Sequence, residues 1–152
     1  MRIIETKVYE FDELNDKAKE QARNWYRGCA LDYEWWDHIY EDAARIGLRI
    51  TAFDLGRRNR IEGKLTEYVK VVCQLIMQEH GKSCDTYQLA EQWSALSTEE
   101  QDDNEADFKN ALLEEYYAML NQEFEYLLAD EQVDEGIRVN GYTFTADGKR
   151  EG

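Results

Sequence analysis

The chain between residues 99 and 135 combines an apolar stripe with most of the protein's negative charge. Phe108, Leu112, Tyr116, Leu120 and Phe124 recur every four residues, which is the spacing of one face of an α-helix. Neither Gly nor Pro interrupts residues 104–130. Ser97 followed by Glu100 is typical of a helix start. The pattern therefore predicts a long helix that begins after Ser97 and runs to about Ala129.

The charge of this acidic stretch (residues 99–135) is a local feature. It holds fourteen acidic residues and one basic residue, Lys109, and so a net of -13 out of -15 for the whole chain. The other residues carry 19 acidic and 17 basic groups. If continuous, a 37-residue helix would extend about 55 Å, and its charge density would approach that of one phosphate strand. Two interpretations stay open, a solvated helix face and a surface that binds a cationic partner.

Composition limits the class of protein. The 152 residues, 43% of them hydrophobic, predict a single domain over residues 1–152. We expect no membrane association, because no apolar run is long enough to span a bilayer and no targeting motif is present. A net charge of -15 disfavours direct binding to nucleic acid and favours basic partners. Three scattered cysteines predict free thiols in a reducing cytoplasm.

The order of elements predicts an α+β fold, with a small antiparallel sheet packed against several helices and one long acidic C-terminal helix. We expect strands at 1–11 and 142–145, a hairpin at 48–55 and 60–66, and a frayed tail after the turn at 146–148. Helices are expected at 15–27, ended by Gly28, and at 33–46, 68–78 and 85–96, with a short final helical turn from Asp130 that closes before Asn140 and Gly141.

The expected hairpin carries the clearest basic patch of the chain, formed by Arg49, Arg57, Arg58 and Arg60. Three roles stay open for Arg57, Arg58 and Arg60. They could offset the acidic surface and protect a strand edge, make a secondary contact with nucleic acid, or bind the acidic helix of another copy.

Motifs for catalysis, cofactors and metals are missing. His38 and His80 lie in no metal-binding motif, and Cys84 with His80 lacks a third group to orient the histidine. A zinc site built from Cys73, His80 and Cys84 lacks a fourth ligand. Residues 102–107 resemble the start of a calcium loop, but Asp107 stands where glycine is required. We therefore predict a protein that is not an enzyme and holds no cofactor or metal.

Three runs resemble small acidic proteins of phages and prophages: Phe11-Asp12-Glu13-Leu14 leading into Ala18-Lys19, Trp25-Tyr26-Arg27, and Tyr33-Glu34-Trp35-Trp36-Asp37 with Tyr40-Glu41-Asp42-Ala43. Several such proteins block bacterial defence as anti-CRISPR or anti-restriction factors. The resemblance implies the same role in the cytoplasm of a bacterial host. The runs lie outside the acidic stretch, so they do not say whether it is a working surface.

The predicted function is a phage-encoded inhibitor that blocks a nucleic-acid-binding site, with a CRISPR effector subunit or a restriction enzyme as partner. The residues expected to bind it, here named the acidic patch, are Glu99, Glu100, Asp102, Asp103, Glu105, Asp107, Glu114 and Glu115. The alternative is an antitoxin-like or regulatory interaction module that binds its partner through Trp and Tyr side chains, and whose binding should be lost on substitution of Trp35 or Trp36. The partner's identity and the oligomeric state stay open.

Overall fold

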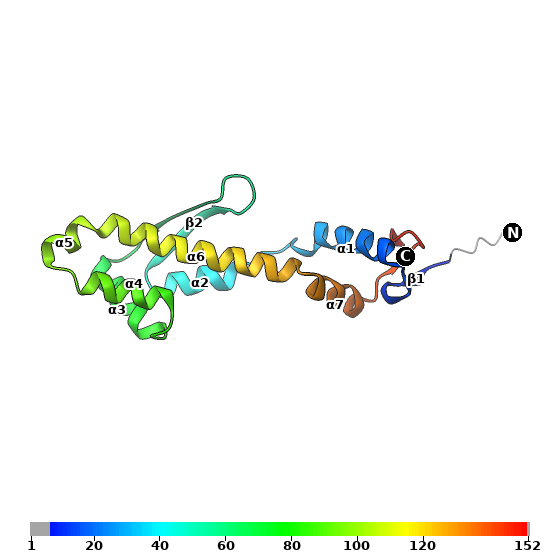
Figure 1. The fold of residues 1–152 in the computed structure, drawn as a ribbon. Helices are drawn as coiled ribbons and strands as arrows, with labels where there is room; N and C mark the ends of the chain where they lie inside the picture. Colours follow the sequence, from blue (N-terminus) through cyan, green and yellow to red (C-terminus); the bar gives the residue numbers. More distant parts are fainter. Residues whose placement is uncertain (1–6, 152) are drawn as a thin grey trace. The chain divides into compact units, whose positions relative to one another are not determined.

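A computed structural model describes residues 7–151 and confirms the α+β class (Figure 1). In that part of the chain it contains seven α-helices and two small antiparallel sheets. None of the helices it describes is long and apolar enough to cross a membrane. The helices are α1 (Asp16–Ala30), α2 (Asp37–Arg45), α3 (Val69–Glu79), α4 (Asp85–Ser94), α5 (Thr98–Asp103), α6 (Glu105–Leu128) and α7 (Asp130–Asn140). The strands are β1 (Tyr9–Glu10), β2 (Leu48–Asp54), β3 (Arg60–Leu65), β4 (Thr143–Phe144) and β5 (Arg150–Glu151), and a 3₁₀ turn covers Phe11–Glu13.

The chain divides into two compact units. The central unit is Trp36–Glu123, and the terminal unit combines Met1–Trp35 with Phe124–Gly152. Helix α6 begins in the central unit and its last residues belong to the terminal unit. The single domain expected over residues 1–152 stays a prediction.

The terminal unit is built on helices α1 and α7 and the sheet β1-β4-β5. Asn15 caps α1, because its side-chain oxygen accepts a hydrogen bond from the Ala18 amide at 2.8 Å, which satisfies one of the free amides of the first turn. The core consists of small and large apolar side chains from the 3₁₀ turn and the residue after it, from α1 and α7, and from β4, namely Phe11, Leu14, Ala18, Ala22, Val133, Ile137 and Phe144.

Two expectations for the terminal unit were wrong, and others were confirmed. Gly28 does not end its helix, since α1 continues to Ala30. The helical turn expected from Asp130, closed before Asn140 and Gly141, is confirmed as helix α7, Asp130–Asn140, although it is longer than a short turn. The tail expected to fray forms β5, which pairs with β4. Of the N-terminal strand, Tyr9–Glu10 is confirmed, and residues 1–6 lie outside the described part.

The central unit contains the predicted hairpin and helices α2 to α5 with most of α6. Strands β2 and β3 pair antiparallel, with Leu48 opposite Leu65 and an irregularity between Ile50 and Ala52. Helix α6 lies alongside the hairpin (Figure 1), and a Cβ at Gly63 would lie 2.8 Å from the Leu113 side chain. Glycine at this position therefore lets β3 approach α6 closely.

The acidic stretch is not one helix. Residues 99–103 lie on α5, the helix is interrupted at Asn104, and α6 then extends for 24 residues to Leu128. At the interruption, the Asn104 side-chain amide donates a hydrogen bond to the Glu100 carbonyl at 2.7 Å, which satisfies an end carbonyl of α5. The acidic residues are thus divided among α5, α6 and α7, and the expectation of one uninterrupted helix from after Ser97 to about Ala129 was wrong.

Two glycines of the terminal unit provide a test of this packing. Both have positive φ, +88° at Gly148 and +66° at Gly141, but a Cβ at Gly148 would collide with the backbone of Ala18, whereas Gly141 has open space around it. We expect Gly148→Ala to lower the free energy of unfolding by about 2–5 kcal/mol, since strain and overpacking add. Gly141→Ala should cost only about 1–2 kcal/mol, from strain alone.

Urea titration of the two alanine variants, followed by circular dichroism, measures this difference. Equal losses for the two variants would contradict the close contact between the β4–β5 turn and α1.

Candidate functional site

The acidic patch begins on α5, a short helix held at both ends by hydrogen bonds. The Ser97 hydroxyl accepts from the Glu100 amide at 3.3 Å and donates to the Glu100 carboxylate at 2.9 Å. Glu99 and Glu100 lie in the first turn, where negative charge is favourable because of the helix dipole. The predicted helix start at Ser97 is therefore confirmed.

Helix α5 is fastened to α4 through one reciprocal contact. The Trp93 indole donates to the Gln101 carbonyl at 3.3 Å, and the Gln101 side-chain amide donates to the Trp93 carbonyl at 3.3 Å. No residue of α5 is buried, so this contact, rather than a core, fixes its position. The four carboxylates of α5 flank Gln101 and are exposed to solvent.

Helix α6 orients the remaining patch residues through its apolar stripe. Phe108, Leu112, Leu113, Tyr116 and Leu120 are buried, as the four-residue spacing predicts. The ring of Phe108 lies 6.2 Å from that of Trp93, so the start of α6 packs on α4. Glu105, Asp107 and Glu114 fall off this stripe and are exposed.

Seven of the eight patch residues are exposed, and Glu115 is partly buried. None of the eight forms an ion pair with any Lys or Arg in the part of the chain that the structure describes. The structure therefore brings six acidic residues together on α5 and the first turn of α6, with no cation to neutralise them among the described residues. Glu114 and Glu115 follow further along α6.

Glu115 differs from the rest of the patch because it faces a cavity of about 450 Å³ in the central unit. Burial, and then the neighbouring carboxylate of Asp85, raise the pKa of Glu115 above its usual value. The proximity of a like charge disfavours the ionised form. The cavity is lined by Asp42, His80, Ser83, Cys84, Asp85, Thr86, Glu115, Ala118, Met119 and Gln122.

A polar network that the sequence did not reveal lies beside this cavity. His80 Nδ1 lies 2.6 Å from Thr86 Oγ1, and His80 Nε2 lies 3.1 Å from Asp42 Oδ2. The Tyr116 hydroxyl donates to the same Asp42 oxygen at 2.7 Å, and burial, with this bond, raises the pKa of Tyr116 well above its usual range. Asp42 therefore orients the His80 ring. No group that could orient the histidine was apparent beside Cys84 and His80 in the sequence.

The hydrogen bonds of this network are all internal to the fold. Both ring nitrogens of His80 already have hydrogen-bond partners, so neither is free to take a proton from Cys84. Thr86 is only 1% exposed, which closes it to a substrate. Asp42 is 38 and 74 positions from His80 and Tyr116, and no sequence motif connects residues so far apart. Among the described residues, no group of three or more His, Cys, Asp and Glu could hold a metal ion.

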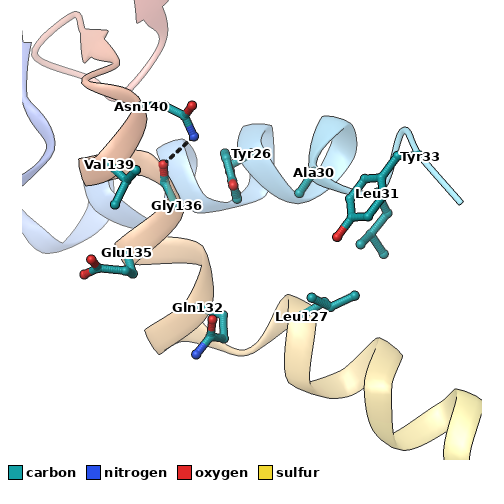
Figure 2. A pocket seen from close by; sticks show the side chains of 10 residues that line it. All are labelled: Tyr26, Ala30, Leu31, Tyr33, Leu127, Gln132, Glu135, Gly136, Val139 and Asn140. Atoms are coloured by element: carbon teal, nitrogen blue, oxygen red, sulfur yellow. Dashed lines mark hydrogen bonds between the residues drawn. The ribbon is translucent and has the colours of Figure 1, made fainter. Parts of the chain in front are cut away.

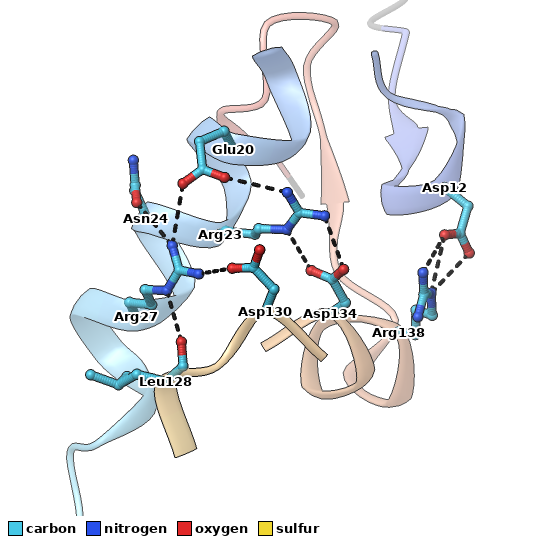
Figure 3. A network of polar contacts seen from close by, with 9 residues as sticks. All are labelled: Asp12, Glu20, Arg23, Asn24, Arg27, Leu128, Asp130, Asp134 and Arg138. Atoms are coloured by element: carbon cyan, nitrogen blue, oxygen red, sulfur yellow. Dashed lines mark hydrogen bonds and ion pairs between the residues drawn. The ribbon is translucent and has the colours of Figure 1, made fainter. Parts of the chain in front are cut away.

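The acidic residues of α7 include two with a different environment. Figure 3 shows Arg23 and Arg27 of α1 facing them within the terminal unit. Arg23 binds Asp134 through two bonds of 2.7 and 3.0 Å, and Arg27 pairs with Asp130. The Asp134 carboxylate raises the pKa of Arg23. These carboxylates are part of the fold's own packing, and the acidic stretch is not uniformly open.

The two tryptophans expected to grip a partner are not prominent on the surface. Trp35 is 8% exposed and packs on Phe124 with 5.8 Å between ring centres. Trp36 is partly buried, with its ring 5.6 Å from that of Phe53. Both therefore belong mainly to the packing of their own units, which weakens the alternative of a tryptophan-mediated interaction.

A second concave site lies in the terminal unit between α1 and α7. Figure 2 shows this pocket of about 260 Å³, with Tyr26, Leu31 and Tyr33 on one side and Gly136 and Val139 on the other. Gly136 allows the Tyr26 ring to lie directly on α7, because a Cβ there would collide with it. The pocket's lining includes one ionisable carboxylate, Glu135, and does not gather a catalytic set.

No protein-family model, curated protein or solved structure matches the chain.

The contrast between paired and unpaired carboxylates predicts two different mutational effects. Asp134→Asn should lower the free energy of unfolding by about 1–3 kcal/mol, because a bidentate, charge-assisted contact with Arg23 is lost. Asp103→Asn should change it by less than about 0.5 kcal/mol, because Asp103 is exposed and has no cationic partner among the described residues. Urea denaturation of both variants tests this, and similar losses would contradict the distinction.

The cysteines predict a reactivity pattern. Cys29 and Cys84 are exposed and Cys73 is buried, and burial raises the pKa of the Cys73 thiol to about 11. At about pH 8, near the usual thiol pKa, we expect a thiol reagent to modify two cysteines in the folded protein and all three in denaturant. The neutral Cys73 thiol contributes stability below its usual pKa, and this is lost as the pH rises through about 11.

With a reagent that releases one coloured group per thiol, the absorbance gives the number of modified cysteines. Cys84→Ser should reduce the folded-state count by one, and modification of all three thiols in the folded protein would contradict the buried position of Cys73.

Proposed function

We propose that this protein is an inhibitor that uses its acidic patch to occupy the nucleic-acid-binding surface of another protein. One observation carries the proposal. The patch carboxylates of α5 and the start of α6 are exposed and have no cationic partner among the described residues, although Arg23 and Arg27 neutralise Asp134 and Asp130 on α7. If these carboxylates served only to stabilise the fold, pairing them with arginines, as on α7, would make the folded protein more stable.

The mechanism follows from electrostatics. Lysines and arginines that bind the phosphates of nucleic acid present a row of positive charge, and exposed carboxylates on a supported helix can pair with them. Opposite charge would also steer the encounter and raise its rate. Because Gln101 and Trp93 hold α5 in place, little conformational freedom is lost when the patch binds.

The partner class rests on the resemblance of residues 11–43 to small acidic phage proteins. It implies a bacterial defence complex as target, such as a CRISPR effector subunit or a restriction enzyme in the cytoplasm of the host. The patch itself supports only the coarser statement of a basic, phosphate-binding surface.

The test is competition for duplex DNA. Purified CRISPR effector and restriction complexes are loaded with labelled DNA, and the protein is added at increasing salt. We expect it to displace DNA from at least one of them. Displacement should become less effective as salt rises, because the electrostatic screening length falls to about 8 Å at 0.15 M ionic strength. Reversal of four charges should weaken displacement at least about fourfold, since each exposed ion pair contributes about 0.2–1 kcal/mol and four pairs are lost. The reversed residues are Glu99, Asp102, Asp103 and Glu114, and Glu100 is kept because it caps α5.

The matched control changes the net charge equally at exposed acidic residues elsewhere, namely Glu34, Glu41, Glu67 and Glu91. It should leave displacement nearly intact. Equal weakening by both sets would show that net charge, and not the patch, is responsible. Absence of displacement from every complex tested would end the proposal for this partner class.

A further inference from the structure

The β2–β3 hairpin presents a second charged surface that the proposed function does not use. Its residues 48–65 carry five basic and two acidic side chains, in a chain whose net charge is -15. All five basic residues are exposed. In the part of the chain that the structure describes, only Arg60 of these forms an ion pair, with Glu62 at 3.0 Å. The basic hairpin is here defined as Arg49, Arg57, Arg58, Arg60 and Lys64.

The tip of the hairpin is stabilised by hydrogen bonds within the turn and to α6. Asp54 Oδ1 accepts hydrogen bonds from the amides of Gly56 at 3.0 Å and Arg57 at 3.1 Å. Asn59 adopts a left-handed conformation with φ of 47°, and its side-chain oxygen accepts from the Tyr117 hydroxyl of α6 at 3.1 Å. The arginines therefore project from a turn that is hydrogen-bonded internally and to α6.

The strands of the hairpin also place like charges side by side. Arg49 lies directly opposite Lys64 in the antiparallel register, an arrangement that disfavours pairing between strands. Neither residue has an acidic partner among the described residues. This unfavourable pair would be relieved by carboxylates supplied from outside the molecule.

The acidic patch and the basic hairpin belong to the same central unit, yet no ion pair connects them among the described residues. Each surface is therefore open for its complement on another molecule. We infer that the basic hairpin of one copy binds the acidic patch of a second copy in a head-to-tail contact. Such a contact uses two different surfaces, so it leaves one of each free and can continue to further copies.

Net charge sets the conditions under which this contact forms. Two molecules of charge -15 repel each other at long range, and that repulsion opposes association at very low salt. At about 0.1 M ionic strength the screening length is about 10 Å, which reduces the repulsion of remote charges and preserves contacts between the two surfaces. At about 1 M it falls to about 3 Å, and the contact should be lost.

Charge exchange between two variants tests the inference with the purified protein alone. Sedimentation velocity should show concentration-dependent association of the native chain at about 0.1 M salt and monomers at about 1 M. Arg57→Glu with Arg58→Glu should abolish association, and so should Glu99→Lys with Asp103→Lys. A mixture of the two double variants should associate again, because the native hairpin of the patch variant meets the native patch of the hairpin variant, and the two reversed surfaces are also opposite in charge.

The control for hairpin reversal is Lys70→Glu with Lys82→Glu, two exposed lysines of the central unit outside the hairpin. It changes the net charge equally and should leave association within about twofold. Circular dichroism verifies that each variant is folded. A native protein that is monomeric at every salt concentration would overturn the inference, as would a mixture of variants that fails to associate.

Duplex DNA tests the alternative that the hairpin arginines bind nucleic acid. Binding of DNA to the native chain that is lost on hairpin reversal, without self-association, would assign the arginines to phosphate and overturn the inference. This experiment contains no defence complex, so its failure leaves the proposed inhibitor function untouched.

Discussion

The burial of the apolar stripe of α6 is the constraint on which the central unit depends. Leu112, Tyr116 and Leu120 are completely buried, and each such side chain contributes about 1.5–3 kcal/mol through its removal from water. Tyr116 adds a polar constraint, because its hydroxyl is held by Asp42, and a buried hydroxyl without a partner would be costly. With the rotation of α6 fixed in this way, Glu105, Asp107 and Glu114 have to face solvent.

Whether a carboxylate is paired depends on whether an arginine lies close enough to bind it. In the terminal unit, α1 packs on α7, and Arg23 and Arg27 lie one turn apart on the face that meets Asp134 and Asp130. Arg138 completes the arrangement by pairing with Asp12 at 2.8 Å while its guanidinium lies 5.6 Å from the centre of the Phe11 ring. In the central unit the arginines are concentrated on the hairpin and do not pair with the carboxylates of α5. One protein therefore contains both structural and unpaired carboxylates.

Local sequence patterns predicted which helices and strands form better than they predicted where these end or which residues they contact. The alternation in 48–55 and 60–66 gave the hairpin, and the four-residue stripe gave the buried face of α6. The interruption at Asn104 was missed because it depends on a side-chain bond to the Glu100 carbonyl and on Trp93 holding Gln101 from α4. Gly28 was expected to end α1, but the helix continues through it to Ala30. The contact between Asp42 and His80 could not be predicted, because it joins residues 38 positions apart, on α2 and just after α3.

The residues of the acidic patch were predicted from the sequence. Their exposure to solvent and their lack of cationic partners among the described residues follow from the tertiary structure. Four carboxylates on the six residues of α5 repel one another, and α5 buries no side chain of its own to offset that repulsion. Its stability comes from the Ser97 cap and from the Trp93–Gln101 contact, both of which leave the carboxylates in water. A solvated face that served solubility alone could be spread over the whole surface, and 13 of the 15 net charges would not have to lie within one quarter of the chain. Placing four carboxylates on the six residues of α5 has a cost in repulsion that a cationic partner would remove.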